Sequence, residues 1–297
     1  MLVCEINLIF ALNFFRAFFM INFNGNISDN HQFNALNRGF LYGDSVFETV
    51  RILDGKVLFL EDHYFRLMAS MRIVRMEIPM DFTMEFFENQ LLETVKACQC
   101  ESATRARLSV FRNGDGLYLP EDRSVSFVVT ASALENQLYI SKNEDYEVEI
   151  YKDFVVTKHL LSTLKTNNRI LNVAGNIFAS ENGYQNCLLI NDSKNIVEAL
   201  NGNIFMLSGN QLVTPPLSEG CLNGIMRKQV LAIAKKLENI EVLEAAISPF
   251  DLQKADELFI TNVISGLQPI TKYRKKEYTA EISSEITKRL NAQIRFA

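Results

Sequence analysis

A lysine and a glutamate in the second half of this sequence could act together on one ligand. Lys165 lies in residues 164–169 (Leu-Lys-Thr-Asn-Asn-Arg), and Glu198 lies in residues 197–205 (Val-Glu-Ala-Leu-Asn-Gly-Asn-Ile-Phe). A lysine amine can condense with an aldehyde, and a carboxylate can hold a protonated pyridine nitrogen, so the pair suits pyridoxal 5'-phosphate (PLP). Most lysines and glutamates are solvated surface groups, so the hypothesis needs support from elsewhere in the chain.

A PLP site also needs donors for the phosphate. Arg66, within residues 61–70, could offer a bidentate guanidinium, although a surface arginine would fit the same helical position. Residues 220–227 (Gly-Cys-Leu-Asn-Gly-Ile-Met-Arg) form a glycine-containing loop that runs into a helix. The N–H groups of Ile225 and Met226 at the start of that helix could donate to a phosphate. Each motif is weak alone and gains meaning from its order along the chain.

The composition is that of a globular protein with enough apolar residues for a large core. The chain has 297 residues, of which 48% are hydrophobic and 22% charged, which fits one large domain or two smaller ones. The formal net charge of -5 gives no electrostatic support for nucleic-acid binding. An anionic ligand must therefore be held by local arginine, lysine and backbone N–H groups.

The cysteines and histidines argue against a disulfide framework and against a metal site. The five cysteines are scattered, without a C-x-x-C pair, at Cys4, Cys98, Cys100, Cys187 and Cys221. The three histidines are His31, His63 and His159. An odd, dispersed cysteine set predicts reduced thiols and a cytoplasmic protein.

Residues 1–19 are apolar and aromatic, but polar residues interrupt the run. A basic n-region and a small-residue cleavage site, as in a signal peptide, are both missing. A membrane-spanning helix would need about 20 nearly uncharged residues. We therefore expect an upstream extension, no membrane association, and a natural start at Met20.

Turn and periodicity signals predict an α+β first domain over residues 20–130. Asn24-Gly25 predicts a first hairpin, and Asp54-Gly55 predicts a second between strands at residues 47–53 and 56–60. Apolar spacing predicts two helices, the second with Thr83 as its N-cap. The expected helices and further strands cover residues 61–76, 83–97, 105–111 and 124–130.

A weak pattern at residues 131–137 predicts an interdomain linker, followed by a larger domain over residues 138–297. This second domain is expected to be rich in short strands that could curl into a barrel. The expected strands are residues 146–157, 186–190, 196–199, 203–207, 211–214 and 257–261. The expected helices are residues 167–182, 224–237 and 279–292, the first of them ending at Gly183.

Six blocks in this order resemble the class IV (fold-type IV) PLP-dependent aminotransferase superfamily. That superfamily contains branched-chain aminotransferases, D-amino-acid aminotransferases and 4-amino-4-deoxychorismate lyases. The similarity covers roughly residues 21–273. The blocks are residues 37–48, 61–67, 164–169, 198–205, 223–227 and 256–262.

The resemblance implies a two-domain fold-type IV enzyme, with a small α/β N-terminal domain and a larger, strand-rich pseudo-barrel domain. It implies that Lys165 is the Schiff-base lysine and that Glu198 pairs with the ring nitrogen. It also implies a homodimer that acts on a small, anionic, amino-acid-like substrate. The phosphate ligands that it implies are Arg66, the amides of Ile225 and Met226, and the Asn262 region.

The subgroup is read from residues near these positions. Branched-chain enzymes usually follow the glutamate with Gly-Thr-Gly, whereas residues 199–201 here are Ala-Leu-Asn. Residues 164–169 are similar to the Leu-Lys-x-x-Asn-Arg pattern of aminodeoxychorismate lyases, and Thr261-Asn262 is similar to their Cys/Thr-Asn. The resemblance therefore favours the lyase, with a branched-chain or D-amino-acid transaminase as the alternative. A non-catalytic homologue is disfavoured because Lys165 and Glu198 are both present.

Candidates for the substrate side lie in the first domain. Arg107 and Arg112 fall on a predicted strand and could bind a substrate carboxylate, although either could be a cross-strand surface partner. Alternation along the strand favours Arg107. Tyr42 and Phe47 are expected to line the same pocket, and Phe47 would suit a core position equally well.

Overall fold

The computed structural model describes residues 20–141 and 144–296, and the chain divides into two compact units. Unit 1 is Met1–Gln137 and unit 2 is Leu138–Ala297. The extension expected over residues 1–19 lies outside the described residues. No helix in the described part of the chain combines the length and apolar content needed to cross a bilayer.

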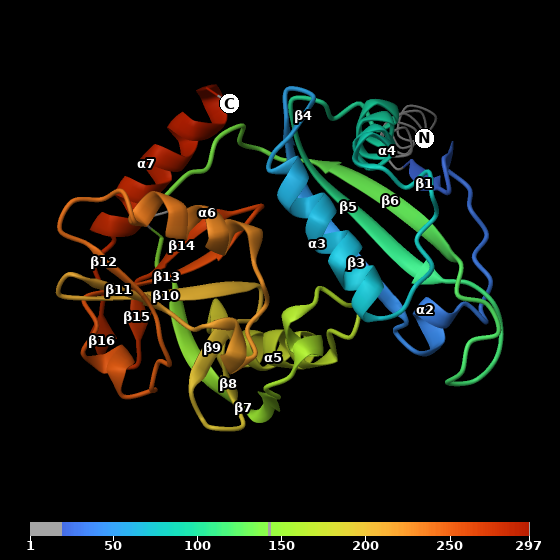
Figure 1. Ribbon diagram of the computed structural model, residues 1–297. Coiled ribbons are helices and arrows are strands. Elements are labelled where there is room, and N and C mark those ends of the chain that lie inside the picture. Colours follow the sequence, from blue (N-terminus) through green and yellow to red (C-terminus); the bar gives the residue numbers. More distant parts are fainter. Residues whose placement is uncertain (1–19, 142–143, 297) are drawn as a thin grey trace, which may run out of the picture. The chain divides into compact units, whose positions relative to one another are not determined.

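Unit 1 is an antiparallel sheet with two long helices packed against it (Figure 1). Its strand order is β2-β1-β6-β5-β3-β4. The strands are β1 (Ile21–Phe23), β2 (Asn26–Ser28), β3 (Ser45–Leu53), β4 (Lys56–Val57), β5 (Ala103–Arg112) and β6 (Val125–Ala133). The helices are α2 (Arg38–Leu41), α3 (Leu60–Ile73) and α4 (Met84–Ala97).

Both predicted hairpins of unit 1 are confirmed, and their turns have the left-handed backbone that Asn-Gly and Asp-Gly allow. Asn24 and Gly25 have φ of 51° and 85°, and Asp54 and Gly55 have φ of 47° and 73°. The strand expected over residues 56–60 is shorter than predicted. Phe59 has φ of 56° and turns the chain into α3, so β4 ends at Val57.

The helices of unit 1 follow the prediction with one shift at a terminus. The Thr83 hydroxyl accepts a hydrogen bond from the Phe86 N–H, which confirms the predicted N-cap of α4. The helix expected to reach residue 76 ends at Ile73, because Arg75 has φ of 60°. Apolar side chains of both helices and of strands β3, β5 and β6 form one buried core.

The linker prediction is wrong at its first residues. Strand β6 continues to Ala133, so residues 131–133 belong to the sheet. Here β6 pairs with β5, with Ala131 opposite Ala106 and Ala133 opposite Thr104. Backbone pairing to a long neighbour extends the strand beyond the point where its apolar pattern fades.

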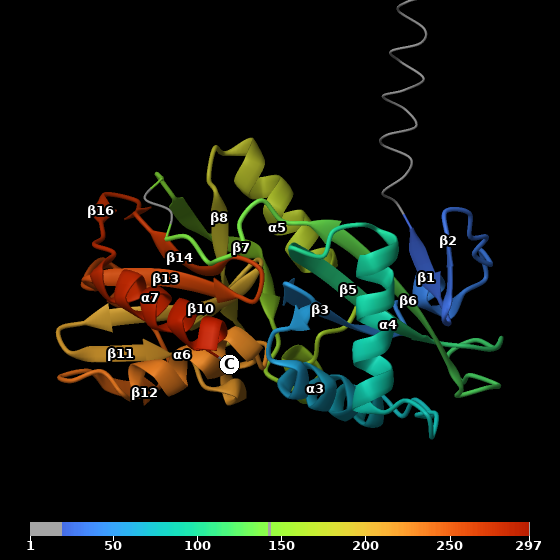
Figure 2. The same ribbon diagram turned by 90° about the horizontal axis from the view of Figure 1, so that it is seen from above.

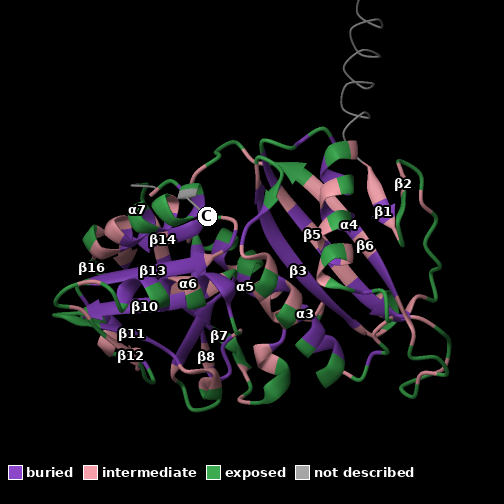
Figure 3. Cartoon of the chain, turned by 45° about the horizontal axis from the view of Figure 1, so that its top comes forward, coloured by how far each residue is buried: buried purple, intermediate pink, exposed green. Residues whose placement is uncertain are grey.

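Unit 2 is built around a branched sheet whose central strands are buried (Figure 3). The main path is β12-β11-β10-β9-β8-β7-β15-β16, and β13 pairs with β10 and β14. The first strands are β7 (Glu147–Val156), β8 (Asn186–Asn191), β9 (Ile196–Ala199), β10 (Gly202–Ser208) and β11 (Gln211–Thr214). The later strands are β12 (Glu241–Glu244), β13 (Glu257–Asn262), β14 (Gly266–Ile270), β15 (Lys272–Tyr273) and β16 (Lys276–Glu277).

The described residues of unit 2 also form α-helices and short 3-10 helices. The α-helices are α5 (Ile170–Glu181), α6 (Ile225–Ala234) and α7 (Glu281–Phe296), and the 3-10 helices are η1 (Leu160–Thr163), η2 (Leu217–Glu219) and η3 (Asp251–Gln253). Helix α6 packs on β13, and α7 packs on β13 and β14 (Figure 2). The helix expected from residue 167 begins at Ile170, because Arg169 has a non-helical backbone.

Candidate cofactor site

Lys165 lies between η1 and α5, in the connection of residues 164–169, where its side chain is half-buried. The guanidinium of Arg169 folds back over this connection. Its Nε donates to the Thr166 carbonyl at 3.0 Å, and its Nη2 donates to the Leu164 carbonyl at 3.0 Å. One side chain therefore binds the carbonyls of the residues before and after Lys165.

Glu198 lies in the short strand β9, all of which is buried, and only 7% of its surface is exposed. Its Oε2 accepts a hydrogen bond of 2.9 Å from the Leu222 backbone N–H. Burial raises the pKa of Glu198, while that hydrogen bond and the positive charges of Arg169 and Lys165 act in the opposite direction. The structure therefore brings Lys165 and Glu198 into one electrostatic neighbourhood.

The loop before α6 connects these two residues. Leu222 donates its N–H to Glu198 and accepts a hydrogen bond of 2.8 Å from the Asn203 side chain. The next amide, that of Asn223, donates to the Thr163 carbonyl at 3.2 Å. The same loop thus contacts the glutamate strand and the turn that precedes Lys165.

The start of α6 provides backbone donors for an anion. Gly224 is the N-cap residue and supplies no side-chain cap, so the amides of Ile225 and Met226 begin the helix without a capping side chain. A Cβ on Gly224 would come within 1.9 Å of Asn203 Oδ1, so this cradle requires glycine. Uncapped N–H groups at a helix N-terminus suit a phosphate.

A buried hydroxyl adds a further donor beside this cradle. Thr261 lies in β13 opposite Asn203, and its Oγ1 has no hydrogen-bond partner among the described residues. Buried hydroxyls are normally paired, so this one suits a polar ligand atom. The side-chain oxygen of Asn262 accepts from the amides of Ile264 and Ser265, which places it in the turn after β13.

This donor set fits PLP. Unit 2 contains a lysine amine for the aldehyde, a buried carboxylate for the ring nitrogen, and an uncapped helix start for the phosphate. When bound, PLP would supply an electron-accepting ring. Lys165 would hold it, Glu198 would keep its nitrogen protonated, and the amides of Ile225 and Met226 would bind its phosphate.

The predicted phosphate ligand of unit 1, Arg66, is not a surface arginine, because its side chain is only 10% exposed. Its Nε and Nη2 donate to the two carboxylate oxygens of Glu48 at 2.7 and 2.5 Å. His63 Nδ1 lies 2.7 Å from Glu48 Oε2. The buried carboxylate of Glu48 therefore fixes the orientation of the Arg66 guanidinium.

Glu48 was not among the predicted site residues. Burial opposes its ionisation, but the charge of Arg66 and the hydrogen bonds from His63 and Arg66 prevail and lower its pKa to about 2. A signal for it was present in the sequence. Glu48 alternates with apolar residues in the strand of residues 45–53, and a glutamate buried in such a strand needs a partner.

The predicted substrate residues lie on or near β3 and β5. The Arg107 guanidinium lies over the Phe47 ring, with its carbon 3.7 Å from the ring centroid, and its Nε donates to Ser109 Oγ at 3.1 Å. Strand register places Phe47 opposite Ser109, so these side chains share a face of the sheet. The structure thus brings Arg107 and Phe47 together.

Two other residues considered for the substrate side have different surroundings. Arg112 donates to Asp44 and to the carbonyls of Val74 and Arg75, which makes it a structural residue of unit 1. Tyr42 follows α2, and its ring centroid lies 5.8 Å from that of Tyr118. Tyr42 therefore packs near the loop between β5 and β6.

Comparisons with known proteins identify the family of this chain. A family model described as "Amino-transferase class IV" matches residues 45–273. The chain belongs to the class IV aminotransferase family. It is a PLP-dependent enzyme of that family, whose members are transaminases or lyases.

Curated relatives span most of this chain. A protein of Methanocaldococcus jannaschii named "Putative branched-chain-amino-acid aminotransferase" is 29% identical over 262 residues, covering 88% of this chain and 90% of that protein. A D-alanine aminotransferase of Listeria monocytogenes is 31% identical over 241 residues, covering 79% and 80%. Family membership therefore extends over both units.

Solved structures share the fold. A branched-chain amino acid aminotransferase from Thermobaculum terrenum, solved in its PLP form, has a TM-score of 0.78 at 21% identity and covers 93% of this chain and 92% of its own. A Legionella pneumophila protein titled "Putative 4-amino-4-deoxychorismate lyase" has a TM-score of 0.77 at 22% identity, covering 89% and 96%. The predicted α+β, fold-type IV architecture is confirmed.

The contacts of Glu48 with Arg66 and His63 lead to a prediction about stability in acid. The pKa of Glu48 lies below its ordinary value of 4.5, so its ionisation stabilises the fold above that pH, and the contribution is lost as the pH falls toward about 2. We expect Glu48→Gln to cost roughly 3–5 kcal/mol at pH 7, because it leaves buried cations without their anion. Denaturant unfolding across pH should show this difference shrinking in acid.

The exposed Glu93→Gln on α4 is the matched control and should unfold like the wild type. A Glu48→Gln protein as stable as this control at pH 7 would contradict the role of Glu48.

Glu198 leads to the opposite prediction for the protein stripped of PLP. Burial raises its pKa above 4.5, so the ionised carboxylate destabilises the folded protein at neutral pH. This destabilisation disappears as the pH falls below 4.5. We expect Glu198→Gln to raise the melting temperature at pH 8, by about 2–4 °C for each kcal/mol recovered. Melting curves recorded with and without PLP should also show less stabilisation by PLP in this variant than in the wild type.

The exposed Glu241→Gln on β12 serves as the control for charge removal in unit 2. Equal melting temperatures and equal PLP stabilisation in wild type and Glu198→Gln would show that Glu198 does not face the ring nitrogen.

Proposed function

We propose that this protein is a 4-amino-4-deoxychorismate lyase, which forms 4-aminobenzoate and pyruvate for folate synthesis. The observation that carries this proposal is the contact of Arg169 with the carbonyls on both sides of Lys165. That arginine is the last residue of the Leu-Lys-x-x-Asn-Arg pattern that resembles the lyases. Because Arg169 contacts the backbone around Lys165, the sequence pattern has a structural counterpart next to the proposed Schiff-base lysine.

In this proposal each predicted residue has one task. Lys165 binds PLP and moves the proton, and Glu198 pairs with the ring nitrogen. Arg66, the amides of Ile225 and Met226, and the Asn262 region hold the phosphate. Arg107 binds a substrate carboxylate, and Tyr42 and Phe47 line the pocket. The cation–π contact between Arg107 and Phe47 supports their sharing a surface.

The reaction needs no second substrate. Lys165 takes the proton from the ring carbon that carries the amine, and the bond from the neighbouring ring carbon to the enolpyruvyl oxygen breaks. The departing group takes up a proton and becomes pyruvate, while the ring becomes aromatic 4-aminobenzoate. Atoms and electrons balance without an oxo-acid acceptor.

An amino-acid transaminase of the branched-chain or D-amino-acid type is the second candidate. The names of the curated relatives favour it. A transaminase would move the amino group to an oxo acid, so it would require an acceptor such as 2-oxoglutarate. This requirement separates the two candidates.

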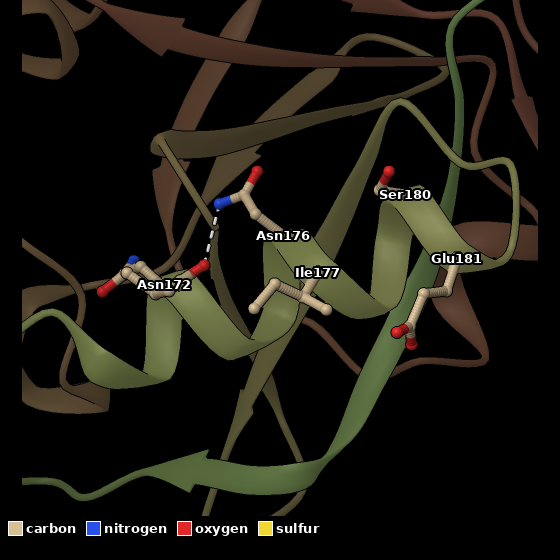
Figure 4. A pocket seen from close by; sticks show the side chains of 6 residues that line it. Asn172, Asn176, Ile177, Ser180 and Glu181 are labelled. Atoms are coloured by element: carbon tan, nitrogen blue, oxygen red, sulfur yellow. Dashed lines mark hydrogen bonds between the residues drawn. The ribbon is translucent and has the colours of Figure 1, made fainter.

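We further propose a homodimer in the cytoplasm. Helix α5 has exposed apolar side chains at Ile170 (80%), Val173 (52%) and Ile177 (54%). Val173 and Ile177 line an open groove of about 450 Å³ together with the polar residues Asn172, Asn176, Ser180 and Glu181 (Figure 4). Contiguous exposed apolar residues are typical of a protein interface, and most soluble oligomers are symmetric dimers. Four free, buried cysteine thiols in the described residues support a reducing compartment.

The product assay tests the lyase. We expect PLP-loaded protein to release pyruvate and 4-aminobenzoate from aminodeoxychorismate without any added oxo acid. Arg107→Ala should raise KM about tenfold or more and leave PLP affinity nearly unchanged, because a lost carboxylate contact acts on the substrate. Dependence on 2-oxoglutarate, with glutamate accumulating, would overturn the lyase in favour of the transaminase.

The α5 surface predicts the oligomeric state. Light scattering after size-exclusion chromatography should give about twice the 33.9 kDa mass of one chain. Ile177→Glu should lower that mass toward a monomer, because it buries a charge in the proposed interface. Lys194→Glu, in the exposed turn between β8 and β9, is the control and should remain dimeric. A wild-type protein of 33.9 kDa would refute the dimer.

A further inference from the structure

Arg169 occupies a position where a cation is electrostatically unfavourable. It is the N-cap residue of α5, and its side chain makes no capping hydrogen bond. The N-terminus of a helix is positive, and asparagine is among the preferred caps, yet Asn167 and Asn168 both precede the cap position. Helix formation does not explain an arginine here.

The hydrogen bonds of Arg169 do explain it. Its guanidinium reaches the carbonyls of Leu164 and Thr166, each at 3.0 Å, so it bridges the residues before and after Lys165. A planar guanidinium has donors on a rigid fork and can span two acceptors, which a lysine ammonium does not match. Fixing both neighbours restricts the backbone from which the Lys165 amine extends.

The charge of Arg169 also acts on Glu198. Among the influences that lower the pKa of this buried carboxyl, the Leu222 N–H comes first, the charge of Arg169 second and that of Lys165 third. The Cys221 thiol, whose pKa is raised to about 12 chiefly by burial, is a further titratable group that interacts with Glu198. An arginine remains charged at all relevant pH values, whereas the charge of Lys165 changes when its amine reacts.

We propose that Arg169 is a positioning residue that fixes the backbone of Lys165 and keeps a permanent positive charge beside Glu198. This inference rests on the proposed roles of Lys165 and Glu198 in binding PLP. It adds a residue that acts through Lys165 and Glu198. Arg169 thereby couples the placement of the amine to the charge state of the carboxylate.

Two substitutions separate the two contributions. Arg169→Lys keeps the charge and loses the bridge between the two carbonyls, and Arg169→Gln loses both the charge and the bridge. Arg289→Gln removes an exposed arginine on α7, paired with Glu285, and is the control for loss of an arginine in unit 2. The PLP dissociation constant, the rate of PLP binding and the pH midpoint of the absorbance of bound PLP are measured for each protein. Melting temperatures show whether each variant folds.

We expect Arg169→Gln to weaken PLP binding about tenfold and to raise the pH midpoint of the absorbance by roughly one unit. The midpoint rises because loss of a nearby positive charge favours the protonated form of the Lys165 nitrogen. Arg169→Lys should restore the midpoint to within a few tenths of a unit of the wild type. It should still react with PLP several-fold more slowly, since the backbone of Lys165 is less restricted.

The inference is overturned if both variants match Arg289→Gln in PLP affinity, midpoint and rate of PLP binding. It is also overturned if their only change is a lower melting temperature, because Arg169 would then be a structural residue. Failure of the proposed function looks different. In that case wild-type protein stays colourless with PLP, and borohydride fixes no cofactor on Lys165.

Discussion

The buried carboxylate of Glu198 constrains the arrangement of unit 2. It lies in a strand whose residues are all buried, so its charge is removed from water and must be met by donors within the fold. The Leu222 amide is one such donor, and Asn203 and the Thr163 carbonyl hold the loop that carries it. A single desolvated group thus connects a hairpin, a helix start and the turn before Lys165.

The buried glutamates Glu48 and Glu198 differ in how far their charge is compensated. Glu48 has Arg66 and His63 against it, and its pKa is lowered to about 2. The pKa of Glu198 is raised, because its burial outweighs the hydrogen bond from the Leu222 amide and the charges of Arg169 and Lys165. Such divergence between carboxyl groups is typical of functional sites. Glu48 stabilises an arginine already in the fold, while Glu198 is suited to a cationic ligand.

The turn after Glu198, where subgroups of the family differ, is held by hydrogen bonds to the buried side chain of Asn186. Asn186 donates to the Asn201 side chain at 2.9 Å and accepts from the Leu200 amide at 3.2 Å. A Cβ on Gly202 would come within 2.5 Å of the Thr261 carbonyl, so glycine is required there. The residues that depart from the Gly-Thr-Gly pattern are therefore supported by buried partners of their own.

Local chemistry in the sequence determined the elements, the hairpin turns and the family. Asn24-Gly25 and Asp54-Gly55 specify their turns because few other residue pairs adopt that backbone, and Thr83 caps its helix through its own hydroxyl. The ends of elements were less well determined. The extension of β6 to Ala133 depends on pairing with β5, which is a tertiary contact.

Only the tertiary structure decided how the charged residues are used. The sequence offered Arg66 for a phosphate and Arg107, ahead of Arg112, for a substrate carboxylate. In the structure Arg112 is engaged by Asp44 and two carbonyls, while Arg66 is ion-paired with Glu48. The use of Arg169 across Lys165 also depends on the way the connection folds back. Residue type determines which contacts a side chain can make, but burial and the partners supplied by distant segments determine which of them form.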